Sequence, residues 1–501
     1  MPPMVEMIAS LSRMKRYWIM GSASGGLCIL FLFIRLGVFQ NGIDQTTSRL
    51  SASVVSLAER ETWMDVFQDD RKIGFSKTKV SKNEKGYRID QELFININTM
   101  GLVQDIRMKT RGILNPDLSM DSFQFQMNSG RFAFAAKGAF SGGMLDISIQ
   151  NAGKEEQSQI RMEKPPYLAA GLFDAVIAHG LKPGEERSFP LFDLTSFGEI
   201  PVTVKALGKE NILNMGISKA ATKVALSYKG ASQFAWISED GEVLREEGLL
   251  GMRLEKTSRE KALSGAAVGS GRDLTEVASV PADGSIKNPQ TLNDLVVEIS
   301  GILLEGMDLH GGRQSLSGNR LRIIKEDLSS PSKWSSLPEK PTDALIPFLK
   351  STPFIQSDHE TVRRLALEIT AGEKHPYDGI RNIVSWMNRN IEKRPTLSVP
   401  DALSTLENKM GDCNEHAMLF AALARAAGIP ATVEAGLVYL KGRFYYHAWN
   451  RAFIGEWITV DSLFNQIPAD VTHIRLIAGT ERSQLDLLAA IGRIGIKILN
   501  G

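Results

Sequence analysis

A period-two alternation of apolar and polar residues marks much of the region from Thr62 to about Leu254 and restricts it to β-structure. The alternation is clear at Phe123, Phe125 and Met127, just before a Ser129-Gly130 turn that predicts a hairpin. One apolar residue in two gives a strand one buried face and one solvated face. We therefore predict a large antiparallel β domain here. It shows no cluster of reactive side chains, so it is expected to bind a partner or act as a spacer.

A second apolar feature lies near the N-terminus, where Tyr17 to Ile34 form 18 residues without a charge. At about 1.5 Å per residue, a helix of this length nearly crosses a hydrocarbon core of about 30 Å. Basic residues at 13, 15 and 16 precede it, which by the positive-inside rule puts the short N-terminus in the cytoplasm. We predict a membrane-anchored protein with an extracytoplasmic bulk. A cleaved signal peptide and a buried soluble helix are the alternatives.

Composition excludes several classes of protein. The chain has 501 residues, with 58 Lys and Arg against 57 Asp and Glu, so its net charge of +1 argues against a nucleic-acid binder. Its 43% hydrophobic content excludes disorder as the main state. With only two cysteines it has neither a disulfide scaffold nor a multi-cysteine metal site. Cys28 falls in the apolar segment and Cys413 near the C-terminus, so the two are not expected to pair.

The most informative segment is NKMGDCNEHAMLFAALARAAGIP. Asp412 can cap a helix, Glu415 can complete a capping box, and Gly428 followed by Pro430 ends the helix. Cys413 then falls at the first helical position, where backbone N–H groups and the helix dipole stabilise a thiolate or an oxyanion. The alternative is that Cys413 is a small buried apolar residue.

A predicted hairpin farther along the chain supplies two partners for this cysteine. If Phe453-Ile454-Gly455 forms a three-residue loop, residue 452 pairs with residue 456, and His447 falls directly opposite Asp461. A carboxylate facing an imidazole fixes its tautomer and stabilises the imidazolium. Cys413, His447 and Asp461 thus form a candidate set of nucleophile, base and orienting acid. Trp449 and Arg451 would share the same face, opposite Thr459 and Trp457.

These motifs resemble the transglutaminase-like core. The resemblance covers about residues 355–475 and rests on the words Gly411-Asp412-Cys413, Leu423-Ala-Arg425-Ala-Ala-Gly428-Ile-Pro430, His447-Ala-Trp449 and Trp457-Ile-Thr-Val-Asp461. It implies an α+β fold in which a helix carrying the nucleophile packs against an antiparallel sheet. It also implies that Cys413 is the nucleophile, His447 the general base and then acid, and Asp461 the orienting carboxylate.

The fold class expected for the whole chain is therefore α+β, with several domains. Stretches rich in Gly, Ser and Pro indicate two joints between them. The expected parts are 1–42, a cytoplasmic stub and transmembrane helix; 43–262, the β-rich domain; 263–290, a linker; 291–345, a short β segment and second joint; and 346–501, the transglutaminase-like catalytic domain.

Other residues near the motif have supporting roles in this interpretation. His416 lies one helical turn from Cys413 and is assigned packing or a hydrogen bond, because one Cys and one His on a helix do not form a closed metal site. Asp412, Tyr445, Trp449 and Trp457 are candidates for lining or supporting the site. No metal and no cofactor are expected. Five other histidines, at 179, 310, 359, 375 and 473, are interpreted as surface or structural residues.

The sequence thus predicts a membrane-anchored, extracytoplasmic cysteine enzyme that acts on amide or related acyl bonds of a protein or peptide through a thioester. Hydrolysis is favoured over cross-linking, because water is always present and no feature selects an amine. The alternative is a non-catalytic scaffold or binding protein that uses the β domain. The oligomeric state is left open.

Overall fold

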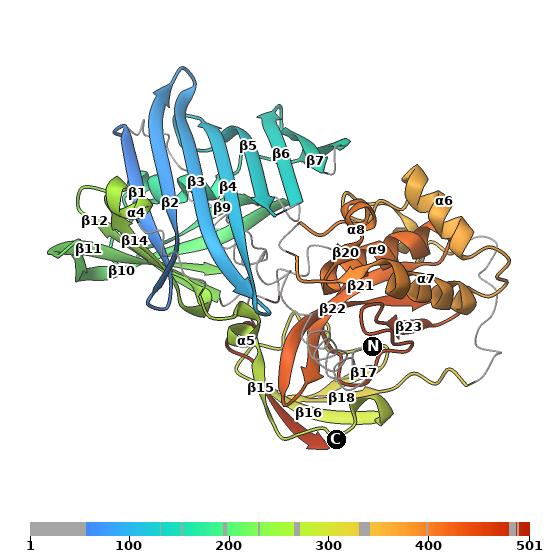
Figure 1. Ribbon diagram of the computed structural model, residues 1–501. Coiled ribbons are helices and arrows are strands. Elements are labelled where there is room, and N and C mark those ends of the chain that lie inside the picture. The colour runs from blue at the N-terminus through green and yellow to red at the C-terminus, as the bar shows by residue number, and fades with distance from the viewer. Residues whose placement is uncertain are drawn as a thin grey trace, which may run out of the picture. The chain divides into compact units, whose positions relative to one another are not determined.

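The computed structural model describes residues 57–500, apart from 131, 152–153, 194–197, 229–230, 265–270, 330–340, 397–398, 480–486 and 488–489. The described chain divides into two compact units, with the boundary between Leu274 and Thr275. Each unit is built on a large β-sheet of its own (Figure 1). The finer boundaries expected from the sequence, at residues 262, 290 and 345, stay predictions.

The N-terminal unit is a 14-stranded sheet with the order β8-β7-β6-β5-β4-β3-β2-β1-β14-β13-β12-β11-β10-β9. Within β1–β8 and within β9–β14, strands adjacent in sequence pair antiparallel, and β1 pairs with β14 to join these two halves. The strands are β1 (Arg60–Gln68), β2 (Arg71–Asn83), β3 (Gly86–Thr99), β4 (Leu102–Leu114), β5 (Met120–Ser129), β6 (Phe132–Ser141), β7 (Met144–Asn151), β8 (Lys154–Arg161), β9 (Glu186–Asp193), β10 (Gly198–Asn214), β11 (Ile217–Tyr228), β12 (Ala231–Ser238), β13 (Val243–Glu247) and β14 (Met252–Thr257).

Side chains alternate between a buried and a more exposed face along these strands. In β4, Ile106, Met108 and Thr110 are buried while the residues between them are exposed. The hairpin predicted at Ser129-Gly130 is confirmed, since β5 and β6 pair with Ser129 opposite Phe132. Between β8 and β9 the chain forms η1 (Ala169–Gly171) and α3 (Leu172–His179). Short elements near the end of the unit are η2 (Leu249–Gly251) and α4 (Arg259–Leu263), and α5 (Leu274–Ala278) spans the boundary between the two units.

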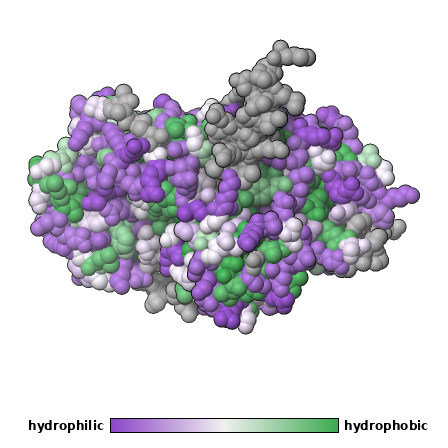
Figure 2. Space-filling model, turned by 60° about the horizontal axis from the view of Figure 1, so that its bottom comes forward, coloured by the Kyte–Doolittle hydropathy of each residue, from purple (hydrophilic) through white to green (hydrophobic). Residues whose placement is uncertain are grey.

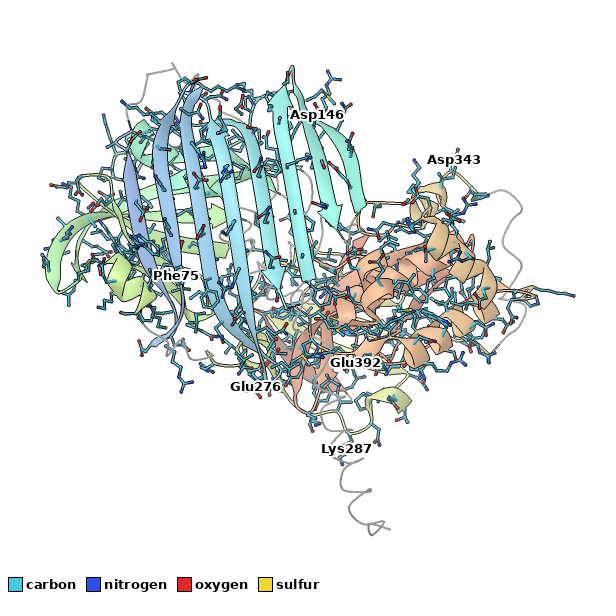
Figure 3. The ribbon with its side chains drawn as sticks, turned by 45° about the horizontal axis from the view of Figure 1, so that its top comes forward. Phe75, Asp146, Glu276, Lys287, Asp343 and Glu392 are labelled. Carbon is cyan, nitrogen blue, oxygen red and sulfur yellow. The ribbon has the colours of Figure 1, made fainter. Side chains whose placement is uncertain are left out.

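The less buried face of this sheet carries a row of aromatic rings. Phe75 of β2 (labelled in Figure 3) lies between Trp63 of β1 and Phe94 of β3, with ring centroids 5.9 and 5.7 Å away. Elsewhere, on the face of the molecule drawn in Figure 2, hydrophilic side chains predominate and hydrophobic ones form smaller areas between them. That mixture is usual for a chain whose apolar residues fill its cores.

The described part of the C-terminal unit combines a nine-stranded sheet with helices packed beside it. The sheet order is β17-β18-β16-β25-β15-β22-β21-β24, and β23 pairs with β22. Its strands are β15 (Val280–Asp283), β16 (Asp294–Ser300), β17 (Gln314–Ser317), β18 (Arg320–Ile324), β21 (Ala431–Leu440), β22 (Arg443–Phe453), β23 (Trp457–Val460), β24 (Ile474–Gly479) and β25 (Gly495–Asn500). A separate pair joins β19 (Glu392–Lys393) to β20 (Met410–Gly411).

Helices α6 (Glu360–Ile369), α7 (Pro376–Asn390), α8 (Ala402–Asn408) and α9 (Cys413–Ala426) gather beside β21 and β22 (Figure 1). Every residue of α9 from Cys413 to Arg425 is buried, because the helix contacts both of these strands and the other three helices. A helix buried on all sides is the central element of its unit. Two 3-10 turns, η3 (Pro289–Thr291) and η5 (Ile346–Leu349), complete the described elements of this unit.

The expected fold class needs correction. Of the described residues, 50% are in strands and 20% in helices, so the chain is mostly β rather than α+β. The expectation combined the α+β core that the resemblance implies with a large β domain, and the fourteen strands of the N-terminal unit make strand predominate over helix. The helices that gave this impression, α6 to α9, all lie in the C-terminal unit.

The expectation of a single-pass membrane protein is also corrected. Among the described residues, no helix is both long enough and apolar enough to span a bilayer. The two longest, α7 with 15 residues and α9 with 14, fall short of the roughly 20 that a hydrocarbon core requires. The segment from Tyr17 to Ile34, on which the expectation rested, lies outside the described residues.

Strand β24 approaches β21 so closely that a side chain at Gly436 has no room. A Cβ atom there would lie 2.0 Å from the carbonyl oxygen of Ile474 and 2.9 Å from the amide nitrogen of Leu476. Since both contacts are backbone atoms, Gly436→Ala must displace β24. We expect it to destabilise the unit by about 2 kcal/mol in chemical denaturation. Gly495→Ala is the control, because its Cβ would meet only the side chain of Ser300, which can rotate. Equal stabilities of the two variants would contradict this prediction.

Candidate active site

Cys413 is the first residue of α9, as the sequence predicted. The Asp412 side chain accepts a hydrogen bond from the Asn414 amide at 3.0 Å, and the Glu415 carboxylate accepts one from the Asp412 amide at 3.0 Å. This is the expected capping box, and it fixes where the helix begins. The cysteine therefore sits at the positive end of the helix dipole. It is free of any disulfide and only 2% exposed.

The sulfur of Cys413 lies against an interrupted edge of β22. On that edge β22 pairs with β15 at Phe444 and with β23 from Asn450 onward. Between Phe444 and Asn450, no strand pairing on this edge is described. In this gap the backbone N–H of Ala448 donates a hydrogen bond to the Cys413 sulfur. Because Ala448 directly follows His447, the thiol lies beside the residue that carries the predicted base.

The resting thiol of Cys413 is held in its protonated form. Burial raises its pKa well above the ordinary value, and the nearby carboxylates of Asp412, Glu415 and Asp461 raise it further. The Ala448 N–H lowers the pKa but does not outweigh burial. The helix N-terminus alone therefore does not maintain a thiolate here, and the sulfur needs a base to take its proton.

The predicted register of the β22–β23 hairpin was wrong by two residues. Ala452 pairs with Ile458 rather than with residue 456, because the loop consists of residues 454–456 instead of 453–455. A shift of two keeps the same residues on each face of a strand. His447 and Asp461 consequently still share a face, although they are not directly opposite each other.

The two side chains meet despite that shift. Asp461 follows the end of β23, and its Oδ2 accepts a hydrogen bond of 2.7 Å from Nε2 of His447. Its Oδ1 accepts a second bond, of 2.8 Å, from the backbone N–H of Phe464. A carboxylate accepts only, so Nε2 of His447 carries the proton and Nδ1 carries the lone pair of the neutral ring. The Phe464 ring stacks on the imidazole with centroids 4.8 Å apart.

His473 also belongs to this cluster. From the sequence it was interpreted as a surface or structural residue. It immediately precedes β24, is fully buried, and places Nε2 3.0 Å from the same Asp461 Oδ2. Three donors therefore converge on the Asp461 carboxylate, and the two imidazoles, despite its burial, hold its pKa far below the usual value. The available signal was the spacing Asp470-x-x-His473, because an acid and an imidazole three residues apart can pair.

His416 is buried one turn along α9 from Cys413. Its Nδ1 donates to the carbonyl oxygen of Asp412 at 2.8 Å, and its Nε2 has no hydrogen-bond partner among the described residues. Burial lowers the pKa of His416 to about 4, and the Lys393 ammonium contributes in the same direction. His416 is thus a neutral imidazole near the nucleophile.

The three aromatic candidates have different environments. Trp449 is buried, donates from Nε1 to Glu434 at 2.8 Å, and stacks beside the His447 ring with centroids 6.0 Å apart. Trp457 is half-buried and meets Phe348 and Phe453 edge to face. Tyr445 is half-buried on β22, two residues from His447 and therefore on the same face.

Residues 363–462, which include Cys413, His447 and Asp461, match the profile of the transglutaminase-like superfamily. This segment belongs to that superfamily. No curated protein matches the chain.

Solved structures give weaker likenesses. A candidate cysteine protease from Cytophaga hutchinsonii is 19% identical over 41% of this chain and 83% of its own, with a TM-score of 0.28. A β-barrel-like protein of a domain of unknown function from Brucella abortus is 11% identical over 41% and 98%, with a TM-score of 0.31. The periplasmic domain of TgpA from Pseudomonas aeruginosa, bound to ethylmercury, is 16% identical over 37% and 89%, with a TM-score of 0.25. At these scores the likenesses support no detailed comparison.

One group in the transglutaminase-like segment and the residues after it has a spacing that a cation could use. Ligand atoms of His447, Asp461 and His473 lie within 4.8 Å of one another. Direct hydrogen bonds of 2.7 and 3.0 Å from the two imidazoles to one carboxylate oxygen already account for this arrangement. We therefore treat the three side chains as a hydrogen-bonded cluster.

Proposed function

We propose that this protein is a cysteine enzyme that cleaves or transfers amide or related acyl bonds of a protein or peptide, with Cys413 as nucleophile, His447 as base and Asp461 as orienting acid. The observation that carries the proposal is the 2.7 Å hydrogen bond from His447 Nε2 to Asp461. The next residue, Ala448, contacts the Cys413 sulfur through its backbone N–H. With Nε2 donating to Asp461, the lone pair of the neutral ring is on Nδ1, and this nitrogen is the one assigned to receive the thiol proton. The transglutaminase-like match supports the same assignment.

The steps follow from these contacts. Nδ1 of His447 removes the Cys413 proton as the sulfur attacks the substrate carbonyl carbon, and the start of α9 stabilises the negative charge that develops on the oxygen. The carbon–nitrogen bond then breaks, and the imidazolium returns its proton to the leaving amine. A thioester on Cys413 remains. Water or an amine attacks it, His447 takes the proton of that group, and the thiol is regenerated.

Hydrolysis is the favoured outcome of the second half-reaction. Water is present at high concentration in any site that opens to solvent, and no described feature selects an amine in its place. Because Cys413 is only 2% exposed, acylation requires a movement that uncovers the sulfur. A small acyl donor is therefore the best first probe.

The proposal is tested with p-nitrophenyl acetate as acyl donor. We expect a burst of nitrophenolate and an acetyl group on Cys413, located by acid quenching, digestion and mass spectrometry, with Cys28 as the internal comparison. Cys413→Ala should show no burst. Adding an amine such as glycine ethyl ester then distinguishes transfer from hydrolysis. A folded protein that acquires no acyl group on Cys413 would contradict the proposal and favour the non-catalytic binding role.

A further inference from the structure

His473 lies between two carboxyl groups. Its Nε2 is 3.0 Å from Asp461 Oδ2, and its Nδ1 is 3.2 Å from the carbonyl oxygen and 3.3 Å from Oδ1 of Asp470. Carbonyl and carboxylate oxygens only accept hydrogen bonds, so both ring nitrogens must carry protons. A ring with two N–H groups is an imidazolium. His473 therefore holds a positive charge in the interior of the unit, 0% of its side chain being exposed.

The second carboxylate is firmly held. Asp470 Oδ1 accepts from the amide and hydroxyl of Thr472 at 2.9 and 2.6 Å, and Oδ2 accepts from the Gln466 side chain at 2.9 Å. These bonds and the charge of His473 keep the pKa of Asp470 well below its usual value despite burial. Hydrogen bonds thus connect Asp470, His473, Asp461 and His447 in one continuous series.

We propose that His473, as an imidazolium fixed by Asp470, is a positioning residue that holds the Asp461 carboxylate against His447 and disfavours a second positive charge on the His447 ring. The proposal rests on the proposed function, which assigns His447 as the base. The two imidazole centroids are 5.5 Å apart, so their charges would repel strongly in a buried site.

Other charged groups near the cluster do not remove this charge. Burial alone would lower the pKa of His473, but Asp470 and Asp461 raise it to about 9. Arg313 donates to the backbone carbonyls of Asp470 and His473 and is paired with Glu326. Lys393 interacts with Asp461 through space. Within the described residues, the two carboxylates are thus the groups that maintain the imidazolium.

The test compares His473→Gln with the unaltered chain. The glutamine amide can donate to Asp461 in place of Nε2 but carries no charge. The rate of Cys413 acylation by p-nitrophenyl acetate is measured from pH 5 to 9. On the acid side of this profile the acylation rate falls as the pH drops, and the pH of half-maximal rate is the midpoint of the acid limb. Without the repelling charge, this midpoint is expected to rise by about one to two pH units. A purely structural role would lower the rate without moving the midpoint.

Two more variants separate charge from position. His473→Leu removes the donor as well and is expected to lower the plateau rate at least about tenfold, as for a lost buried charge-assisted bond. His375→Gln makes the same exchange at an exposed histidine of the same unit and should leave the profile unchanged. Circular dichroism shows whether each variant is folded. A His473→Gln profile that superimposes on that of the unaltered chain would overturn the inference.

A measurement independent of activity keeps the two proposals distinguishable. With nitrogen-15 histidine, the His473 signals are identified by their disappearance in His473→Gln. Both ring nitrogens are expected to be protonated at pH 7, and one unprotonated nitrogen would refute the inference. If Cys413 instead fails to acylate while His473 is doubly protonated, the proposed function fails and the charged state of His473 stands.

Discussion

Replacing Asp461 by asparagine is expected to lower the rate of Cys413 acylation by about 1,000-fold or more, as loss of a buried orienting carboxylate does in related nucleophile–imidazole sites. The reason lies in three contacts. Oδ2 accepts from the two imidazoles of His447 and His473, and Oδ1 accepts from a backbone N–H. An amide has one acceptor oxygen. In one orientation its NH2 group faces the two imidazoles, which disturbs the His447 tautomer. In the other it faces the Phe464 N–H, which disturbs the loop after β23.

The same substitution should also destabilise the C-terminal unit. Asp461→Asn leaves the buried His473 imidazolium with one carboxylate in place of two, and breaking a buried ion pair typically costs about 3–5 kcal/mol. Hydrogen exchange of peptides from β22 and β24 measures this loss within the unit itself. Asp378→Asn is a matched control, because Asp378 forms an ion pair with Arg381 near the surface of α7. An Asp461→Asn variant that keeps a tenth of the original acylation rate would refute the role assigned to Asp461.

The position of the nucleophile could be predicted because its signals are local. The start of α9 is set by Asp412 and Glu415, which bond to the first turn, and its end by the Gly428 and Pro430 pair. Each of these acts within a few residues of sequence. A capping box and a stop therefore locate Cys413 at a helix start without any knowledge of the sheet that the helix meets.

The hairpin shows where local reasoning stops. Sequence placed the loop at residues 453–455, but the chain turns at residues 454–456, and several three-residue connections suit that composition. The face of His447 was right because a shift of two preserves it. The facing pairs were wrong, since Arg451 lies opposite Thr459 rather than Trp457.

His473 could not be placed from local patterns. It reaches Asp461 only because β24 pairs with β21, which puts a segment twelve residues downstream beside the end of β23. Pairing between strands that are distant in sequence depends on the whole sheet, and so does the close approach at Gly436. The fold class was wrong for a different reason: α+β describes the core that the resemblance implies, whereas the strands extend through both units.

The pH dependence of stability should have a maximum near pH 6.5 in the C-terminal unit. His473 has a folded-state pKa raised to about 9, so its contribution is complete below the unfolded value near 6.5 and is lost as the pH rises toward 9. His416 has its pKa lowered to about 4, so the unit loses stability as the pH falls from 6.5 toward 4, where the unfolded ring gains a proton. Each shift of about 2.5 units corresponds to about 3 kcal/mol.

The loss of stability above pH 6.5 (the alkaline limb) and the loss below it (the acid limb) can be separated by substitution. Hydrogen exchange of β21 and β22 peptides at pH 4.5, 6.5 and 8.5, corrected for the intrinsic pH dependence of exchange, gives the opening free energy on each side. His473→Gln should flatten the alkaline limb and leave the acid limb intact, whereas His416→Gln should do the reverse. The raised pKa of Cys413 adds a further loss only above its unfolded value near 9, outside this range. If the alkaline limb keeps its full size in His473→Gln, the buried imidazolium does not supply the stability assigned to it.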